Sequence, residues 1–281
     1  MKIKIARHYG LCGGVKRALN IVEEALKECN GEILYIFHEI VHNTFVINEL
    51  KKKNIIFTDS LDSVPDGAKI VFSAHGVSRA VEDKSREKNL RIFDATCLLV
   101  KKNHAVVEQA FSENKRIIFI GSKSHPECIG TIGRVDDGYC LVVENEDDIK
   151  NMPDIDDEMV SLSQTTLAID DTEKIRKSLS RKYPQIKHEN GICSSTSLRQ
   201  QSVRELAMEC DLILVIGSKT SSNSCRLLQI AKNCGSEAKL VDSVEDIKDF
   251  DFSGVSCTGI TAGASTPQEQ VDEIINFVRM K

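Results

Sequence analysis

Short apolar runs alternate with helix-patterned segments along the whole chain of 281 residues. The apolar runs are rich in Ile, Val, Leu and Phe, a composition typical of buried strands. Between them, apolar residues recur at helical spacing, as in Val15, Ala18, Leu19 and Val22. The expected strands are 3–5, 33–37, 55–57, 70–72, 117–120, 140–143, 160–162, 212–216, 238–241 and 256–260. Strands that alternate with helices predict an α/β fold with parallel-type sheets.

The pattern occurs three times. From a cysteine, a helix and a strand lead to a Gly-Ser-Lys tripeptide 24 residues later in two copies, from Cys97 to Gly121 and from Cys193 to Gly217. A related copy begins at Cys12. The three copies divide the chain into units of about 90 residues, which are small for independent folding but adequate if they share a centre. A chain of this length buries roughly three quarters of its unfolded surface. We therefore expect one compact three-lobed body, with α/β lobes at residues 1–96, 97–192 and 193–281.

The charge pattern excludes some classes of partner. The formal net charge is −5 with both signs interspersed, unlike the basic footprint of a nucleic-acid-binding protein. The cluster Lys51-Lys52-Lys53 is interpreted as a solvated helix end. No apolar stretch approaches the roughly 20 residues that cross a bilayer, and the first residues do not resemble a signal peptide. We expect a cytoplasmic protein with no nucleic-acid or membrane partner.

Three of the ten cysteines are candidate metal ligands. Cys12, Cys97 and Cys193 each precede a predicted helix, whose N-terminus favours the thiolate form. Three thiolates can bind zinc or three irons of a cubane cluster. Structural zinc usually takes ligands two to four residues apart, whereas these lie 85 and 96 residues apart, so a 4Fe-4S cluster is favoured over zinc. The cysteines expected to be small buried apolar residues are Cys29, Cys140, Cys210, Cys234 and Cys257, with Cys128 and Cys225 set apart because they fall in candidate site loops.

Polar side chains follow the strands of all three copies. Ligands of parallel sheets bind beyond the carboxyl ends of strands. If the lobes pack about a pseudo-threefold axis, the converging set is Cys12, Cys97, Cys193, His42, His75, His125, Glu127, Thr165, Ser221, Asn223 and Ser265. Histidines, hydroxyls and a helix N-terminus near Ser224 can bind phosphate. A cluster with three protein ligands leaves one iron open as a Lewis acid.

Glu127 is the one carboxylate in this set, and it lies in the loop that carries His125. Negative charge nearby would raise its pKa and make it a proton donor. The alternative is a structural glutamate paired with a base such as Arg134.

Several motifs together resemble the 4-hydroxy-3-methylbut-2-enyl diphosphate reductase family of isoprenoid biosynthesis. They are Gly10-Leu11-Cys12-Gly13-Gly14-Val15, Val41-His42-Asn43, Ser73-Ala74-His75-Gly76, Asp94-Ala95-Thr96-Cys97, His125-Pro126-Glu127, Gln164-Thr165-Thr166, Ser221-Ser222-Asn223-Ser224 and Thr261-Ala262-Gly263-Ala264-Ser265. The resemblance covers nearly the whole chain.

This resemblance implies a trefoil of three α/β/α lobes around a 4Fe-4S cluster, which the three cysteines bind with one iron not held by protein. It also implies that Glu127 and Thr165 serve the substrate hydroxyl and proton delivery. It implies diphosphate binding by His42, His75, His125, Ser221, Ser222, Asn223 and Ser265. The reaction would be reductive loss of the allylic hydroxyl as water, with electrons from a donor such as ferredoxin or flavodoxin. Two alternatives stay open at this point: another three-lobed cluster enzyme such as quinolinate synthase, and a cluster-bearing redox sensor without a substrate.

Overall fold

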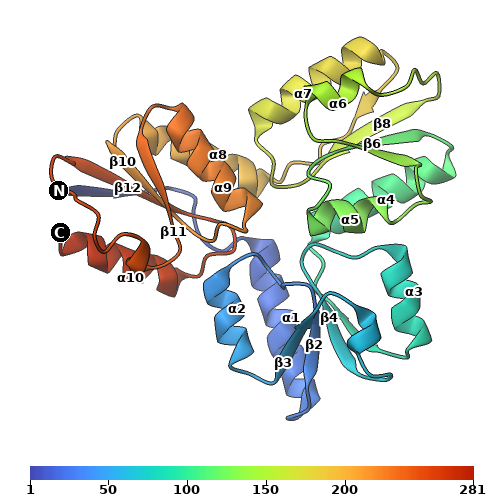
Figure 1. The fold of residues 1–281 in the computed structure, drawn as a ribbon, viewed down its shortest axis with the longest axis horizontal. Helices are drawn as coiled ribbons and strands as arrows, with labels where there is room; N and C mark the ends of the chain where they lie inside the picture. Colours follow the sequence, from blue (N-terminus) through green and yellow to red (C-terminus); the bar gives the residue numbers. More distant parts are fainter. The chain divides into compact units, whose positions relative to one another are not determined.

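The computed structural model describes residues 1–281 and divides the chain into two compact units. Unit 1 comprises Met1–Lys16, Val41–Lys53 and Ser194–Lys281, and unit 2 comprises Arg17–Ile40 and Asn54–Cys193. All strands belong to three four-stranded sheets, and every strand pair is parallel (Figure 1). The expected α/β fold with three sheets is confirmed.

The first sheet of unit 2 lies in the first third of the chain. Its strands, in hydrogen-bonded order, are β3 (Ile55–Thr58), β2 (Leu34–Phe37), β4 (Lys69–Phe72) and β5 (Arg91–Asp94). The helices along this part of the chain are α1 (Gly13–Cys29), α2 (Thr44–Lys51), the 3-10 helix η1 (Leu61–Ser63) and α3 (Arg79–Glu87).

The second sheet of unit 2 repeats this order. Its strands are β7 (Cys140–Val143), β6 (Arg116–Ile120), β8 (Met159–Ser163) and β9 (Lys187–His188). Its helices are α4 (Leu98–Ser112), α5 (Pro126–Ile132), α6 (Glu146–Lys150) and α7 (Ile169–Lys182). One apolar cluster lies between the sheet and α4 with α5, and another between the sheet and α6 with α7, so both faces of the sheet are buried (Figure 1).

The sheet of unit 1 combines the two ends of the chain. Its strands are β11 (Glu237–Val241), β10 (Leu212–Ile216), β12 (Cys257–Ala262) and β1 (Lys2–Ile5). Its helices are α8 (Ser194–Ala207), α9 (Ser222–Asn233), the 3-10 helix η2 (Val244–Asp246) and α10 (Gln268–Arg279). One apolar cluster lies under α8 and α9 and a second under α10. All five residues of β10 are buried, which explains its continuous apolar sequence.

The three sheets share one topology. In each sheet, the edge strand next to the third strand of the hydrogen-bonded order leads to one of the candidate cysteines. These are β5, which leads to Cys97, β9, which leads to Cys193, and β1, which leads to Cys12. β1 pairs with β12, with Ile3 opposite Thr258. The first strand of the predicted lobe 1–96 therefore completes the sheet of the predicted lobe 193–281, and residues 41–53 also belong to unit 1.

The other cysteines follow the sequence prediction in part. Cys29, Cys210 and Cys257 are buried, as expected, and Cys128 is fully buried on the inner side of α5. Cys140 is half-buried and Cys225 is exposed. For Cys234 the prediction was wrong: it is exposed, because it caps the C-terminus of α9 instead of facing the sheet. None of the helices is long and apolar enough to pass through a membrane.

Candidate active site

The three candidate cysteines stand immediately before helices. Cys12 precedes α1, Cys97 is the N-cap residue of α4, and Cys193 precedes α8. The backbone nitrogen of Val15 donates to the Cys12 sulfur over 3.4 Å. All three side chains are half-buried, unlike the core cysteines. The free backbone N–H groups at a helix N-terminus can donate hydrogen bonds to a sulfur atom in this setting.

Each of these cysteines is also tied to the loop that follows the third strand of its sheet. The three bonds run from Cys12 N to Ala264 O (2.9 Å), from Cys97 N to Ala74 O (3.0 Å) and from Cys193 N to Thr165 O (3.2 Å). These loops carry predicted substrate ligands: Ser265 and His75 follow the bonded alanines, and Thr165 is itself the bonded residue. A cysteine and a predicted substrate ligand are therefore held together in each of the three sheets.

Glu127 and Thr165 form a buried pair in unit 2. The Thr165 backbone nitrogen donates to Glu127 Oε1 over 2.8 Å, and the Thr165 hydroxyl donates to Oε2 over 2.8 Å. Burial raises the pKa of Glu127 to about 7, although the two hydrogen bonds from Thr165 act in the opposite direction. The alternative partner Arg134 is excluded, because its guanidinium pairs with Glu82 and Glu108.

The segment around Glu127 is helical where the sequence predicted a loop. Glu127 lies in the first turn of α5, with Pro126 at its first position and His125 as its N-cap. The Glu127 backbone nitrogen donates to Nδ1 of His125 over 3.1 Å. This bond requires a lone pair on Nδ1, so the neutral ring carries its hydrogen on Nε2, which can donate to an anion. The ring of His75 lies 5.6 Å from that of His125, centroid to centroid, at 90°.

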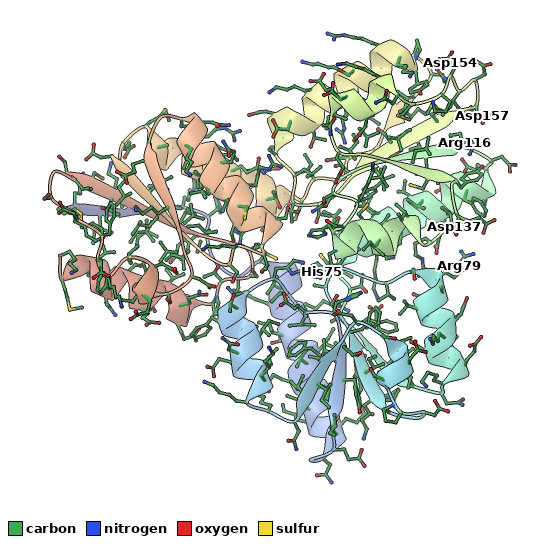
Figure 2. All side chains as sticks on the ribbon, in the orientation of Figure 1. His75, Arg79, Arg116, Asp137, Asp154 and Asp157 are labelled. Atoms are coloured by element: carbon green, nitrogen blue, oxygen red, sulfur yellow. The ribbon has the colours of Figure 1, made fainter.

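Gly76 lies in a narrow gap between two helices of unit 2. It follows His75, which Figure 2 labels in the segment between β4 and α3, and has φ +78°. A Cβ at Gly76 would lie 2.7 Å from Cε1 of His104 on α4, and a Cβ at Gly130 on α5 would lie 3.1 Å from the Gly76 backbone. Burial lowers the pKa of His104 to about 4, so its ring is neutral at physiological pH. The backbone beside His75 is thus held from both sides.

In unit 1, the start of α9 forms a second group of predicted ligands. Ser221 is the N-cap residue, and its oxygen accepts from Ser224 N (3.2 Å) and from the Ser224 hydroxyl (3.1 Å). The helix begins at Ser222, two residues before the predicted start. Asn223 is only 4% exposed, and neither its side-chain nitrogen nor its side-chain oxygen has a hydrogen-bond partner. A buried amide without partners is costly, which is typical of a side chain that meets a ligand.

His42 and Ser265 are joined in the same unit. The Ser265 hydroxyl donates to the His42 carbonyl over 2.9 Å. The one hydroxyl hydrogen of Ser265 is therefore directed at the protein backbone, where the sequence predicted a bond to diphosphate. In this arrangement, Ser265 orients His42.

The structure thus groups the predicted site residues in two sets. Unit 2 holds Cys97, Cys193, His75, His125, Glu127 and Thr165. Unit 1 holds Cys12, His42, Ser221, Ser222, Asn223 and Ser265. In neither unit do three or more His, Cys, Asp or Glu side chains form a metal-binding group. The predicted three-cysteine set draws one ligand from unit 1 and two from unit 2.

Comparisons with known proteins cover almost the entire chain. The LytB protein family matches residues 3–279. A protein of Actinobacillus succinogenes named 4-hydroxy-3-methylbut-2-enyl diphosphate reductase is 46% identical over 99% of this chain and 90% of its own length. A protein of the same name from Haemophilus influenzae is 47% identical with the same coverage.

Two solved structures are also similar. That of the E-1-hydroxy-2-methyl-but-2-enyl-4-diphosphate reductase from Plasmodium falciparum is 35% identical, with a TM-score of 0.94 over 98% of this chain and 87% of that one. A structure of (E)-4-hydroxy-3-methyl-but-2-enyl diphosphate reductase is 34% identical, with a TM-score of 0.72 over 100% of both chains.

Proposed function

Because the chain belongs to the LytB protein family, we propose that it reduces 4-hydroxy-3-methylbut-2-enyl diphosphate to isopentenyl diphosphate and dimethylallyl diphosphate. Two electrons and two protons are consumed, the C–O bond of the allylic hydroxyl breaks, and the hydroxyl leaves as water. The observation that carries the proposal is the buried Glu127 carboxyl, held by Thr165 with a pKa of about 7.

We propose that Cys12, Cys97 and Cys193 hold a 4Fe-4S cluster with one iron not bound by protein. The donor set fits this group, since all three thiols are half-buried and stand at helix N-termini, outside the apolar core clusters. When bound, such a cluster supplies electrons and a Lewis-acidic iron for the leaving hydroxyl.

The proposed diphosphate site consists of polar side chains that follow the strands. Its proposed members are His42, His75, His125, Ser221, Ser222, Asn223 and Ser265, of which Ser265 acts through the His42 carbonyl to which it donates. His125 offers an Nε2 hydrogen, and the start of α9 adds backbone N–H groups and a favourable dipole. Asn223 would gain its missing partners when the ligand binds. None of these side chains carries a negative charge that would repel the diphosphate.

Glu127 is the proposed proton donor. Thr165 orients the carboxyl from two directions, and the buried site excludes water from it. A pKa of about 7 leaves a substantial protonated fraction at neutral pH, and it also allows the carboxylate to regain its proton. The Thr165 hydroxyl lies beside the acid and can bond to the substrate hydroxyl in turn.

The proposal further assigns a one-electron donor such as ferredoxin or flavodoxin as the protein partner and the cytoplasm as the location. The test is anaerobic purification, with iron and sulfide analysis, followed by turnover of the diphosphate substrate with a chemical reductant. About four irons per chain and formation of both products would support it. A reducible cluster with no consumption of substrate would indicate a redox sensor instead.

A further inference from the structure

Asn43 and Gln270, 227 positions apart in sequence, form a hydrogen bond in the interior of unit 1. The Asn43 Nδ2 donates to the Gln270 Oε1 over 3.1 Å. Asn43 is 0% exposed and Gln270 is 1% exposed. The bond links the N-cap of α2 to the first turn of α10. Asn43 directly follows His42, and Gln270 lies five residues after Ser265.

The carboxylate of Asp242 determines the direction of every bond in this chain of amides. Nε2 of Gln270 donates to the Asp242 carbonyl (2.6 Å) and to its Oδ1 (3.1 Å). Because a carboxylate only accepts, Gln270 must turn its NH₂ toward Asp242 and its oxygen toward Asn43. The NH₂ of Asn43 then donates to Gln270, and the side-chain oxygen of Asn43 accepts from Val46 N over 2.9 Å. This second bond caps α2.

A second connection runs beside the first. The hydroxyl of Ser218 donates to Oδ2 of Asp242 over 3.1 Å and accepts from the backbone nitrogen of Thr44 over 2.8 Å. The Thr44 hydroxyl oxygen lies 2.5 Å from the Ser218 hydroxyl oxygen. Thr44 must be the donor of this bond, because the hydroxyl hydrogen of Ser218 already bonds to Asp242. Asp242 therefore holds both residues that follow His42, one through Gln270 and one through Ser218.

We propose that Gln270 is a positioning residue for diphosphate binding, which it serves by holding Asn43 and thereby the orientation of His42. The inference rests on the proposed function. Ser265 holds the His42 carbonyl and Gln270 holds the next side chain, so the backbone of His42 is fixed on both sides. Such support keeps a ligand-binding side chain within a fraction of an ångström of its working place. Gln270 itself binds no substrate.

Gln270→Leu tests this role in the cluster-loaded protein. Leucine fills a similar volume but leaves the Asn43 amide and the Asp242 acceptors without their partner, so the segment carrying His42 loosens. We expect the Kd for inorganic diphosphate and the KM for substrate to rise about tenfold, since displacement of a positioned group by about 1 Å has effects of this order or larger. The kcat and the iron content should stay close to those of the unchanged protein.

The matched control is Gln268→Leu. Gln268 lies on the same helix but is exposed, and its amide bonds only to Asp272 within α10. Its diphosphate affinity should equal that of the unchanged protein. If Gln270→Leu fails to fold, Asn43→Asp replaces it, because Asp keeps the cap oxygen for Val46 but has no hydrogen for Gln270.

A double-mutant cycle separates positioning from general damage. In a protein that already carries His42→Ala, Gln270→Leu should cause no further loss of diphosphate affinity, because its effect passes through His42. Additive losses, or a diphosphate affinity of Gln270→Leu equal to that of the unchanged protein, would overturn the inference. Failure of the proposed function is distinguishable, since the unchanged protein would then neither bind diphosphate nor consume the substrate.

Discussion

Thr165 donates two hydrogen bonds to the Glu127 carboxyl, one from its backbone nitrogen and one from its hydroxyl, each over 2.8 Å. The pair fixes both oxygens of an acid that is 2% exposed. Burial favours the protonated form and the two donors favour the ionised form, and the pKa of about 7 is the balance of these opposing effects. The acid is thus both oriented and able to change its protonation state near neutral pH.

Glu127→Gln should abolish proton donation with little change in shape. We expect kcat to fall by about two or more orders of magnitude, in line with the loss of a general acid. For the unchanged protein, kcat/KM should fall as pH rises above about 7, because Glu127 then loses its proton, and this limb should vanish in the variant. Iron content and diphosphate affinity should be preserved. The control is Glu49→Gln, at an exposed position of α2. Near-normal turnover of Glu127→Gln under saturating reductant would assign Glu127 a structural role.

Thr165→Val should move the pH dependence in a stated direction. Loss of the hydroxyl removes a bond that favours ionised Glu127, so the pKa of Glu127 rises further above its ordinary value. The fall of kcat/KM on the alkaline side should therefore shift to higher pH. The value of kcat/KM below this fall shows whether the Thr165 hydroxyl also acts on the substrate. Thr172→Val removes a buried hydroxyl that bonds only to the Ala168 carbonyl and serves as control. A downward shift of the limb would contradict the stated pairing.

Asn223→Ala should affect binding and stability differently. Without a ligand, the side-chain amide of Asn223 has no partner. Its removal should therefore lower the free energy of unfolding by less than about 1 kcal/mol, or raise it. Diphosphate binding should weaken by about 1–3 kcal/mol, because the lost bonds form only with the ligand. Denaturant unfolding and calorimetric titration measure the two quantities. A large loss of stability with unchanged affinity would exclude Asn223 from the diphosphate site.

The cysteines divide into two sets with different expected behaviour. Cys12→Ser, Cys97→Ser and Cys193→Ser should each remove or degrade the cluster. Cys29→Ser, at a buried position of α1, and Cys225→Ser, at an exposed position of α9, should retain full iron and sulfide content. Iron and sulfide assays after anaerobic purification distinguish the sets. Equal iron loss in both would refute the ligand assignment.

Gly130→Ala is expected to destabilise the protein, although alanine normally stabilises a helix by about 1 kcal/mol relative to glycine. The new Cβ would lie 3.1 Å from the Gly76 backbone, so α5 must move away from the segment that carries His75. Diphosphate affinity should fall with stability, since His125 caps the same helix. Ile129→Ala, at an exposed position of α5, controls for the helix itself. A stability gain would show that the contact relaxes without cost.

The strands were predictable because most are buried on both faces and appear as continuous apolar runs. The three cysteines were predictable as helix-start residues from the apolar spacing that follows each of them and, for Cys12, from the two glycines after it. β5 and β9 were not among the expected strands, because β5 has only two apolar residues, Ile92 and Phe93, and the two residues of β9, Lys187 and His188, are polar. The helical start at Pro126 was missed although proline is favoured at the first position of a helix.

Long-range contacts account for the remaining differences. Gln270 resembles any polar residue at the start of a helix, and nothing near it in sequence indicates a bond to Asn43. His104 fits an amphipathic helix pattern, yet its importance comes from its closeness to Gly76. Both cases depend on contacts that only the folded chain creates.

The pairing of β1 with β12 orders events during synthesis. β1 leaves the ribosome long before its partner β12, so the sheet of unit 1 stays incomplete until β12 has emerged. The other two sheets come from continuous stretches, residues 34–94 and 116–188, and can form while translation proceeds. Joining the ends of so long a chain costs conformational entropy before the strand pair offsets it. The loop with Cys12, which follows β1, therefore reaches its final place after those of Cys97 and Cys193. Insertion of the proposed cluster would then wait until β12 has joined the sheet of unit 1.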